Sequence, residues 1–406
     1  DVHGELRFAG DEVEIVELRG RGPTGADVAI TGDLLLPRGD VAVDIRIRSE
    51  DLPIDEHLVA ALESGPRRLV EELFAREAAA RLDGLGLLDG EEGPFPFGGT
   101  VAVDLRIEQD LGKDAPLITT GTIAVDGNGV LLEAFNYPVV TGDGLIRLED
   151  ERIVLEPPGI PFTTPGGGLG VVSGSIDIPR RRDPETGSRS RGFEPHLNIR
   201  IPRDRPSAAL LATIEPPAWI ATPESCPRRW ADLVEATGSI GIEGVLRPDP
   251  DGGLDPDWAF TAILDGIRAR LRPPLIEAIA SLDLAWPADA VVEDLSGRLE
   301  LVPGSVTIAG MTGRLEQPGL PATLAVDGSI LPRDASIDVE IACAELDART
   351  WFDATRDPTR DSMWIRRDLE GSLDARVRLR RAAGVGEILA GIVGGRIEID
   401  GEPAMP

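Results

Sequence analysis

A strict alternation of apolar and polar residues constrains this chain more than any other feature of its sequence. Within residues 41–48, the odd-numbered residues are Val41, Val43, Ile45 and Ile47, and most of the even-numbered residues are charged. Successive side chains of a β-strand point to opposite faces, so this segment predicts a strand with one apolar and one polar face. Similar alternating segments are residues 101–107, 197–201, 337–341 and 373–379.

The alternating segments belong to a longer internal repeat. The stretch from Gly4 to Leu58 contains Gly-x-Leu, Val-x-Ile, a strand punctuated by glycine, and a long alternating strand. The stretch from Gly297 to Phe352 contains the same elements in the same order, and a looser third copy begins at Gly144. Such self-similarity indicates an array of similar supersecondary units.

The expected fold is therefore mainly β with interspersed helices. We expect an elongated, curved antiparallel β-sheet, shaped like a groove or taco and built from internal repeats. Glycine and proline concentrate between the alternating segments, where turns require them. The predicted domains are a β-repeat unit at 1–120, a second unit with helical inserts at 121–295, and a third, truncated unit at 296–406.

Several helices are expected to interrupt the strands. Asp55 is a suitable N-cap for a helix over residues 55–62, and Pro66 opens a second helix, so residues 55–85 form a helical insert. Shorter helices are expected over residues 207–213, 227–236, 264–282 and 349–354.

The composition excludes some classes of partner. The chain has 71 acidic and 41 basic residues, a formal net charge of −30, which argues against binding to nucleic acid or to an anionic membrane surface. An apolar content of 42% is sufficient for a folded core. The two cysteines, Cys226 and Cys343, are expected to be buried apolar residues, although a single long-range disulfide stays open.

The sequence contains no motif that is typical of an active site. His3, His57 and His196 have no histidine or cysteine at metal-ligand spacing, and the glycine-rich residues 165–170 precede a strand instead of a phosphate-binding helix. We therefore expect no enzyme activity, no cofactor and no metal.

Two polar segments leave alternatives open. Residues 249–257 hold four aspartates that could bind calcium, although Asp, Gly and Pro also make turns. Arginines from Arg180 to Arg191 could contact lipid headgroups, and the favoured alternative is a solvated hairpin loop.

The repeat as a whole resembles the AsmA-like superfamily. The resemblance rests on Gly4 to Leu18, Gly32 to Pro37, and the strand that ends in Leu52-Pro53-Ile54-Asp55; the second copy has Asp347-Ala348 in place of Pro53-Ile54. It implies a protein anchored in the inner membrane that extends into the periplasm and conducts phospholipids along an apolar trough for outer-membrane biogenesis, as bridge-like lipid transfer proteins do. The chain is then expected to be a fragment whose membrane segment lies elsewhere.

The expected ligand-binding element is one strand face instead of a pocket. Acyl chains need apolar contact and no hydrogen bonds, so the apolar face itself is the candidate site. Its candidate residues are Val41, Val43, Ile45, Ile47, Val101, Val103, Leu105, Ile107, Ile337, Val339 and Ile341. The alternative is a non-catalytic structural or adhesive β-protein of the cell envelope, whose apolar faces are closed by packing.

Overall fold

The structure is a computed structural model, and it is mainly β. It describes residues 2–22, 25–37, 40–61, 67, 70, 71, 74, 79, 80, 83, 95–112, 115–131, 137–182, 189–212, 230–250, 256–280, 290–317, 321–331, 336–347, 371–381 and 389–399. Of these residues, 72% lie in strands, which form one long antiparallel sheet that is not closed into a barrel, and the helices are few and short. The expected fold class is confirmed.

By its internal contacts, the chain divides into two compact units. Unit 1 comprises Asp1–Arg200 and Val245–Asp257, and unit 2 comprises Ile201–Gly244 and Trp258–Pro406. The three repeat units expected at 1–120, 121–295 and 296–406 describe sequence similarity and stay a prediction. None of the helices in the described part of the chain combines the length and the apolar content needed to span a lipid bilayer.

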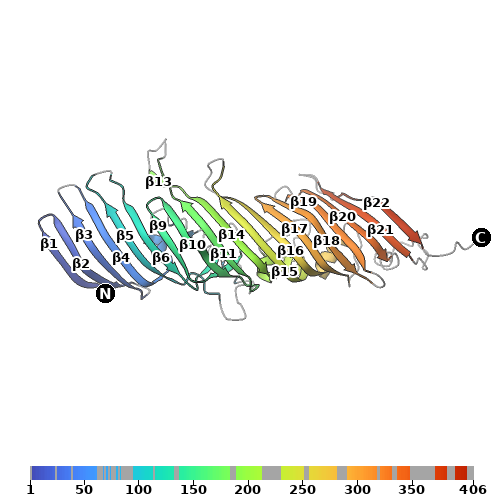
Figure 1. Cartoon of the computed structure of the whole chain (residues 1–406), viewed down its shortest axis with the longest axis horizontal. Helices are drawn as coiled ribbons and strands as arrows, with labels where there is room; N and C mark the ends of the chain where they lie inside the picture. The colour runs from blue at the N-terminus through green and yellow to red at the C-terminus, as the bar shows by residue number, and fades with distance from the viewer. Residues whose placement is uncertain are drawn as a thin grey trace, which may run out of the picture. The chain divides into compact units, whose positions relative to one another are not determined.

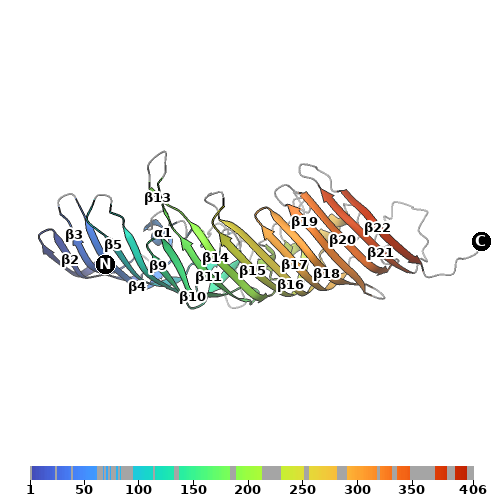
Figure 2. The same ribbon diagram turned by 45° about the horizontal axis from the view of Figure 1, so that its top comes forward.

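Unit 1 is a series of antiparallel strands that follow one another side by side (Figures 1 and 2). Its sheet strands pair in the order β1, β2, β3, β4, β5, β6, β9, β10, β11 and β14, with β7 and β8 joined to the end of β10. The strands are β1 Val2–Ala9, β2 Glu12–Arg21, β3 Asp27–Leu35, β4 Ala42–Pro53, β5 Thr100–Gln109, β6 Ile118–Val125, β7 Gly129–Leu131, β8 Pro138–Thr141, β9 Gly144–Glu149, β10 Arg152–Thr163, β11 Leu169–Asp177, the separate hairpin β12 Arg180–Arg182 and β13 Arg189–Arg191, and β14 Glu194–Asp204, whose last residues belong to unit 2.

Unit 2 contains the second copy of the repeat. Its helices are α4 Ala208–Ala212, α5 Trp230–Leu233 and α6 Pro273–Ala280. Its strands are β15 Val234–Arg247, of which the last residues belong to unit 1, β16 Asp257–Leu271, β17 Val291–Val302, β18 Ser305–Glu316, β19 Ala322–Leu331, β20 Ser336–Asp347, β21 Gly371–Arg381 and β22 Leu389–Ile399. Strands β16 to β22 pair in chain order, each antiparallel to the next.

The internal repeat is visible in the backbone of both units. Gly4 in β1 and Gly297 in β17 have φ angles of +157° and +155°, and Gly32 in β3 and Gly328 in β19 have φ angles of +142° and +149°. These values lie in a region that residues with a Cβ rarely adopt. The two copies therefore have glycines with the same unusual backbone conformation at equivalent positions.

The first expected helix is confirmed as α1, Glu56–Ala61. Its N-cap is Asp55, whose Oδ1 accepts the backbone N–H groups of His57 and Leu58, each at 2.9 Å. Most of the second expected helix, up to residue 85, and all of residues 349–354 lie outside the described residues.

The helix expected over residues 264–282 is wrong in its first half, because β16 continues to Leu271 and α6 begins only at Pro273. A β-bulge explains the error. Gly266 has a φ of +59°, and the register shifts between Leu264 and Ile267. These two residues pair with Gly297 and Leu295, which are two positions apart in β17, so both side chains lie on one face of the sheet. A spacing of three residues, which is typical of a helix, therefore arises within a strand.

Candidate functional site

One face of the unit 1 sheet carries continuous rows of apolar side chains. Ile45 of β4 lies directly between Gly32 of β3 and Ile107 of β5 in the register of the sheet. Ile47 lies in the same way between Ile30 and Leu105. The rows continue onto β6, β9 and β10 through cross-strand pairs such as Ile123–Ile146 and Leu148–Ile153. We call this surface the apolar face of unit 1.

The candidate residues on this face differ in exposure. Val43, Ile45, Ile47, Leu105 and Ile107 are half-buried, and Val41, just before β4, is 41% exposed. A ligand that lies along the sheet can reach side chains with this degree of exposure.

The other two candidates in unit 1, Val101 and Val103, are only 6% and 7% exposed. They form a buried cluster with Val125 and Ile160, and the side chain of Ile54 packs against it. These two valines are therefore part of the protein core.

Unit 2 has an equivalent apolar face. Val339 of β20 is paired with Gly328 of β19, and Ile341 with Val326. Ile337 and Val339 are buried, whereas Ile341 is half-buried and packs against a buried cluster made by Ala290, Val292, Leu315, Ala322, Leu324, Cys343 and Leu346. Burial raises the pKa of the Cys343 thiol to about 11, so this thiol stays protonated near neutral pH. Cys226 lies outside the described residues.

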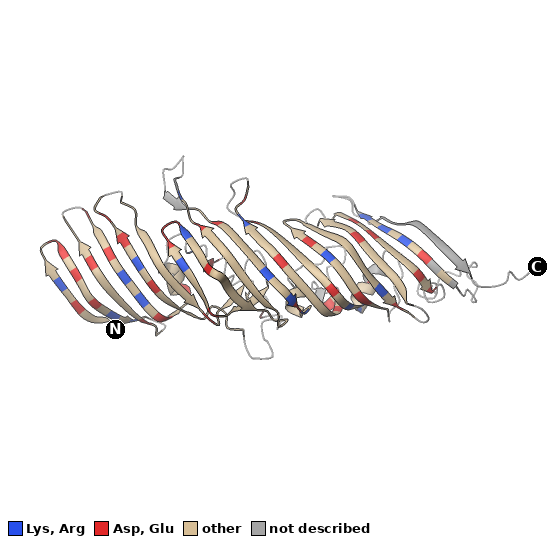
Figure 3. Ribbon diagram, in the orientation of Figure 1, with Lys and Arg blue, Asp and Glu red and all other residues tan. Residues whose placement is uncertain are grey.

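Many residues that alternate with the apolar rows of unit 1 are charged, and Figure 3 marks them as blue and red bands on neighbouring strands. Because side chains alternate along a strand, they lie on the opposite face of the sheet. Arg46 of β4 and Arg106 of β5 are directly opposite each other in the register. Each guanidinium instead binds a carboxylate diagonally: Arg46 donates to Asp104 at 2.6 and 2.6 Å, and Arg106 donates to Asp44 at 2.9 and 2.7 Å. The repeated sequence Val-Asp-x-Arg produces this arrangement, because antiparallel pairing of two such strands places unlike charges on the diagonals.

These ion pairs lower the pKa of both carboxyl groups. Hydrogen bonds from Arg106 lower the pKa of Asp44, and hydrogen bonds from Arg46 lower the pKa of Asp104. All of these side chains are more than a third exposed, so each pair contributes about 0.2–1 kcal/mol to stability. They connect β4 and β5, which are far apart in the sequence.

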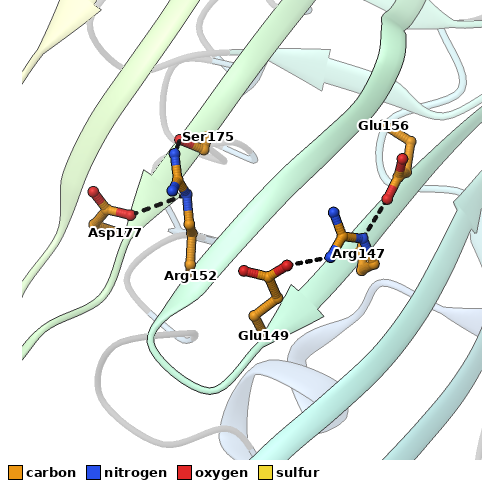
Figure 4. A network of polar contacts seen from close by, with 6 residues as sticks. All are labelled: Arg147, Glu149, Arg152, Glu156, Ser175 and Asp177. Atoms are coloured by element: carbon orange, nitrogen blue, oxygen red, sulfur yellow. Dashed lines mark hydrogen bonds and ion pairs between the residues drawn. The ribbon is translucent and has the colours of Figure 1, made fainter.

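A second polar network joins β9, β10 and β11 (Figure 4). Arg147 of β9 binds Glu149 of the same strand and Glu156 of β10. Arg152 of β10 donates to the Ser175 hydroxyl at 2.7 Å and lies 3.3 Å from Asp177 of β11. Every charged group in this network binds an opposite charge or a hydroxyl, so the network holds strands together.

Two shallow depressions lie on the charged side of the sheet. The one in unit 1 has a volume of about 530 Å³ and is lined mainly by Thr31, Asp33, Thr122 and the Asp44–Arg46–Asp104–Arg106 group. The one in unit 2 has a volume of about 940 Å³, and small side chains such as Thr312, Ala325, Ala342 and Ala344 line part of it.

The polar segments singled out from the sequence do not converge on a site. His196 lies 3.5 Å from Asp177 and is half exposed. Arg180 contacts Asp150 and donates to the Leu117 carbonyl at 3.1 Å, while the side chains from Arg181 to Arg191 are not described. In the calcium candidate, residues 251–255 lie outside the described part of the chain. Over the described residues, no group of three or more His, Cys, Asp and Glu side chains could hold a metal ion.

Comparison of the chain with protein-family models, curated proteins and solved structures finds no match.

An ion pair between β20 and β21 predicts how the stability of unit 2 depends on pH. Asp338 of β20 accepts two hydrogen bonds from Arg378 of β21, at 2.7 and 2.8 Å, and they lower the pKa of Asp338 to about 2. A lowered pKa in the folded state contributes stability that is present above the unfolded value of about 4 and is lost as the pH falls through about 2. Because both partners are exposed, we expect Asp338→Asn to lower the stability of unit 2 by about 0.5–1 kcal/mol at pH 6.

The melting temperature of the wild type and of Asp338→Asn between pH 6 and pH 2 tests this prediction. The difference between the two proteins should shrink as the pH falls from 4 to 2. A difference that stays constant over this range would show that the ion pair does not stabilise the fold.

Proposed function

We propose that this chain binds or conducts lipid acyl chains along the apolar face of its sheet, as a periplasmic segment of an AsmA-like protein in outer-membrane biogenesis. The observation that supports it most is the half-buried set of apolar side chains in unit 1, of which Ile45 and Ile107 are a directly opposed pair. The proposal assigns no catalytic step and no cofactor to the chain.

The chemistry of this face suits an acyl chain better than a polar ligand. Each methylene group removed from water contributes about 0.8 kcal/mol, and it needs no hydrogen-bond partner. The rows Ile30–Ile47–Leu105 and Gly32–Ile45–Ile107 run across neighbouring strands, so a ligand can contact several strands at once. The charged side chains of the same strands point to the opposite face of the sheet, and that face is exposed to water.

The proposed periplasmic location and the proposed partners are supported by the resemblance to the AsmA-like superfamily. The partner is a phospholipid or another lipid, and the attachment to the inner membrane is through a segment outside this chain. The net charge of −30 favours a soluble body that does not dock onto anionic headgroups by itself.

Lipid bound to the purified protein tests the proposal. We expect native mass spectrometry to detect lipid with the wild type, and the double variant Ile45→Asp/Ile107→Asp to reduce bound fluorescent phospholipid at least about tenfold, since each lost apolar contact is worth about 1.5–3 kcal/mol. A milder variant, Ile45→Ser/Ile107→Ser, should give an intermediate loss. Circular dichroism verifies that each variant is folded.

The control variant places one acidic residue on the other face of the sheet. Thr31 of β3 pairs with Arg46 on the charged face, so Thr31→Asp should leave lipid binding unchanged. If a folded wild type never carries lipid, or if Thr31→Asp and the double variant lose lipid equally, the apolar face is not a lipid site.

A structural or adhesive β-protein of the envelope is the second candidate function. It is favoured by the buried cluster around Leu315, Leu324 and Leu346 in unit 2, where side chains of the apolar face are covered by protein. In that case, the polar substitutions at Ile45 and Ile107 would change stability alone.

A further inference from the structure

β1 lies at one edge of the sheet in unit 1. β1 pairs with β2 along its whole length, and no strand of the described residues pairs with its other side (Figure 1). All eight residues of β1 are exposed, and Val2, Leu6 and Phe8 are exposed by 74%, 42% and 73%. A long edge strand with exposed apolar side chains is a template for pairing with a further strand.

The internal repeat shows what such an edge pairs with. The β1–β2 hairpin and the β17–β18 hairpin have the same register: Leu6 pairs with Ile15 as Leu299 pairs with Ile308. Phe8 likewise pairs with Val13 as Leu301 pairs with Val306. β1 and β17 are therefore equivalent strands, as the similar positive φ angles of Gly4 and Gly297 also indicate.

In the second copy, the equivalent edge is occupied. β16 pairs antiparallel with β17 and places Leu264 opposite Gly297, Ala262 opposite Leu299, and Phe260 opposite Leu301. Phe260 is only 4% exposed in this arrangement, and Leu299 and Leu301 are half-buried. A strand on the edge of β17 thus covers the positions that are exposed in β1.

We propose that the outer edge of β1 binds an antiparallel β-strand of another polypeptide segment with the alternating pattern of β16, so that large apolar side chains lie opposite Gly4 and Phe8. The backbone of β1 supplies hydrogen bonds to the added strand, and its apolar residues supply the specificity. This inference is independent of lipid binding, although the added strand would lengthen the apolar face.

A peptide with the sequence of β16, residues 257–271, serves as the probe. We expect it to slow hydrogen exchange of β1 backbone amides in the full chain at least about tenfold, because amides on the outer edge become hydrogen-bonded. A peptide with Asp in place of Ala262 and Leu264 should give no protection. Protection should be confined to β1.

The same substitution, Leu→Arg, in the edge strand and in an internal strand tests whether the peptide binds at the edge. Leu6→Arg introduces a charge on the apolar side of the edge strand and should weaken the protection by the peptide at least about tenfold. Leu145 has a similar exposure, 41%, but lies in the internal strand β9, so Leu145→Arg should leave the protection unchanged.

Three outcomes contradict the proposal. In the first, β1 exchanges at the same rate with and without the peptide. In the second, both peptides protect β1 equally, which indicates non-specific apolar association. In the third, β1 is protected without peptide and sedimentation velocity shows a dimer that Leu6→Arg dissociates, so that the occupant is a second copy of this chain.

Discussion

Gly32→Ala is expected to lower the free energy of unfolding of unit 1 by about 2–5 kcal/mol. Gly32 has a φ of +142°, and a Cβ added there would lie 2.0 Å from the carbonyl oxygen of Asp44 and 2.8 Å from the Cα of Ile45. Both atoms belong to the backbone of β4, so the clash cannot be relieved by a side-chain rotation. The β3 and β4 backbones must separate, or residue 32 must leave its positive φ.

Hydrogen exchange of the β3 and β4 amides measures this effect locally, and urea denaturation measures it for the whole chain. The control is Gly22→Ala, because a Cβ at Gly22 would be 3.7 Å from its nearest neighbour, the carbonyl oxygen of Ala26, which is an ordinary contact. It should change stability by less than about 1 kcal/mol. Equal effects of the two substitutions would show that the close approach at Gly32 is not required.

The same clash recurs in the second copy of the repeat. A Cβ at Gly328 would lie 2.3 Å from the carbonyl oxygen of Asp338. The glycine that the sequence repeat aligns with Gly32 thus has the same steric reason to be a glycine. This agreement supports the idea that the two copies share a backbone geometry as well as a residue pattern.

Much of the fold could be predicted from the sequence because strands have a period of two. The alternating residues 41–48 and 101–107 form β4 and β5, and Gly4 and Gly32 share their positive φ with Gly297 and Gly328 of the second copy. The prediction was wrong where a bulge shifted the alternation. At Gly266, the extra residue placed Leu264 and Ile267 on one face and imitated a helical spacing.

The exposure of the candidate face could not be predicted, because it depends on contacts that are distant in the sequence. Val101 and Val103 follow the same alternation as Ile45 and Ile47, yet both valines are buried by packing with Ile160 of β10. The diagonal ion pairs of Arg46 and Arg106 also depend on a register set between separate strands. Alternation predicts which face a side chain is on, and tertiary packing decides what covers it.

A buried asparagine, which no sequence motif marks, is expected to stabilise unit 1. Asn128 is 1% exposed, and its Nδ2 donates to the carbonyl oxygens of Gly98 and Thr100 at 2.9 and 2.8 Å. Its Oδ1 accepts the backbone N–H of Asp126 at 3.0 Å. The amide therefore connects the turn after β6 to the segment that leads into β5.

Asn128→Asp is expected to destabilise unit 1 by about 3–5 kcal/mol at neutral pH, and Asn128→Ala by about 2–4 kcal/mol. The carboxylate cannot donate to the two carbonyl oxygens and would be a buried, unpaired charge among them, whereas alanine only leaves them without a donor. These carbonyls raise the pKa of the introduced carboxyl group above its unfolded value. The protonated form predominates below that raised pKa, so the destabilisation by Asn128→Asp should decrease as the pH falls towards 4.

Denaturation of unit 1 at pH 8 and pH 4 distinguishes these effects. Asn198→Asp is the matched control, because Asn198 is exposed in β14 of the same unit and the chemical change is identical. It should alter stability by less than about 0.5 kcal/mol at either pH. If Asn128→Asp is no more destabilising than Asn198→Asp, the hydrogen bonds of Asn128 do not hold the β5 and β6 ends together. If its effect is the same at both pH values, the new carboxylate is not buried.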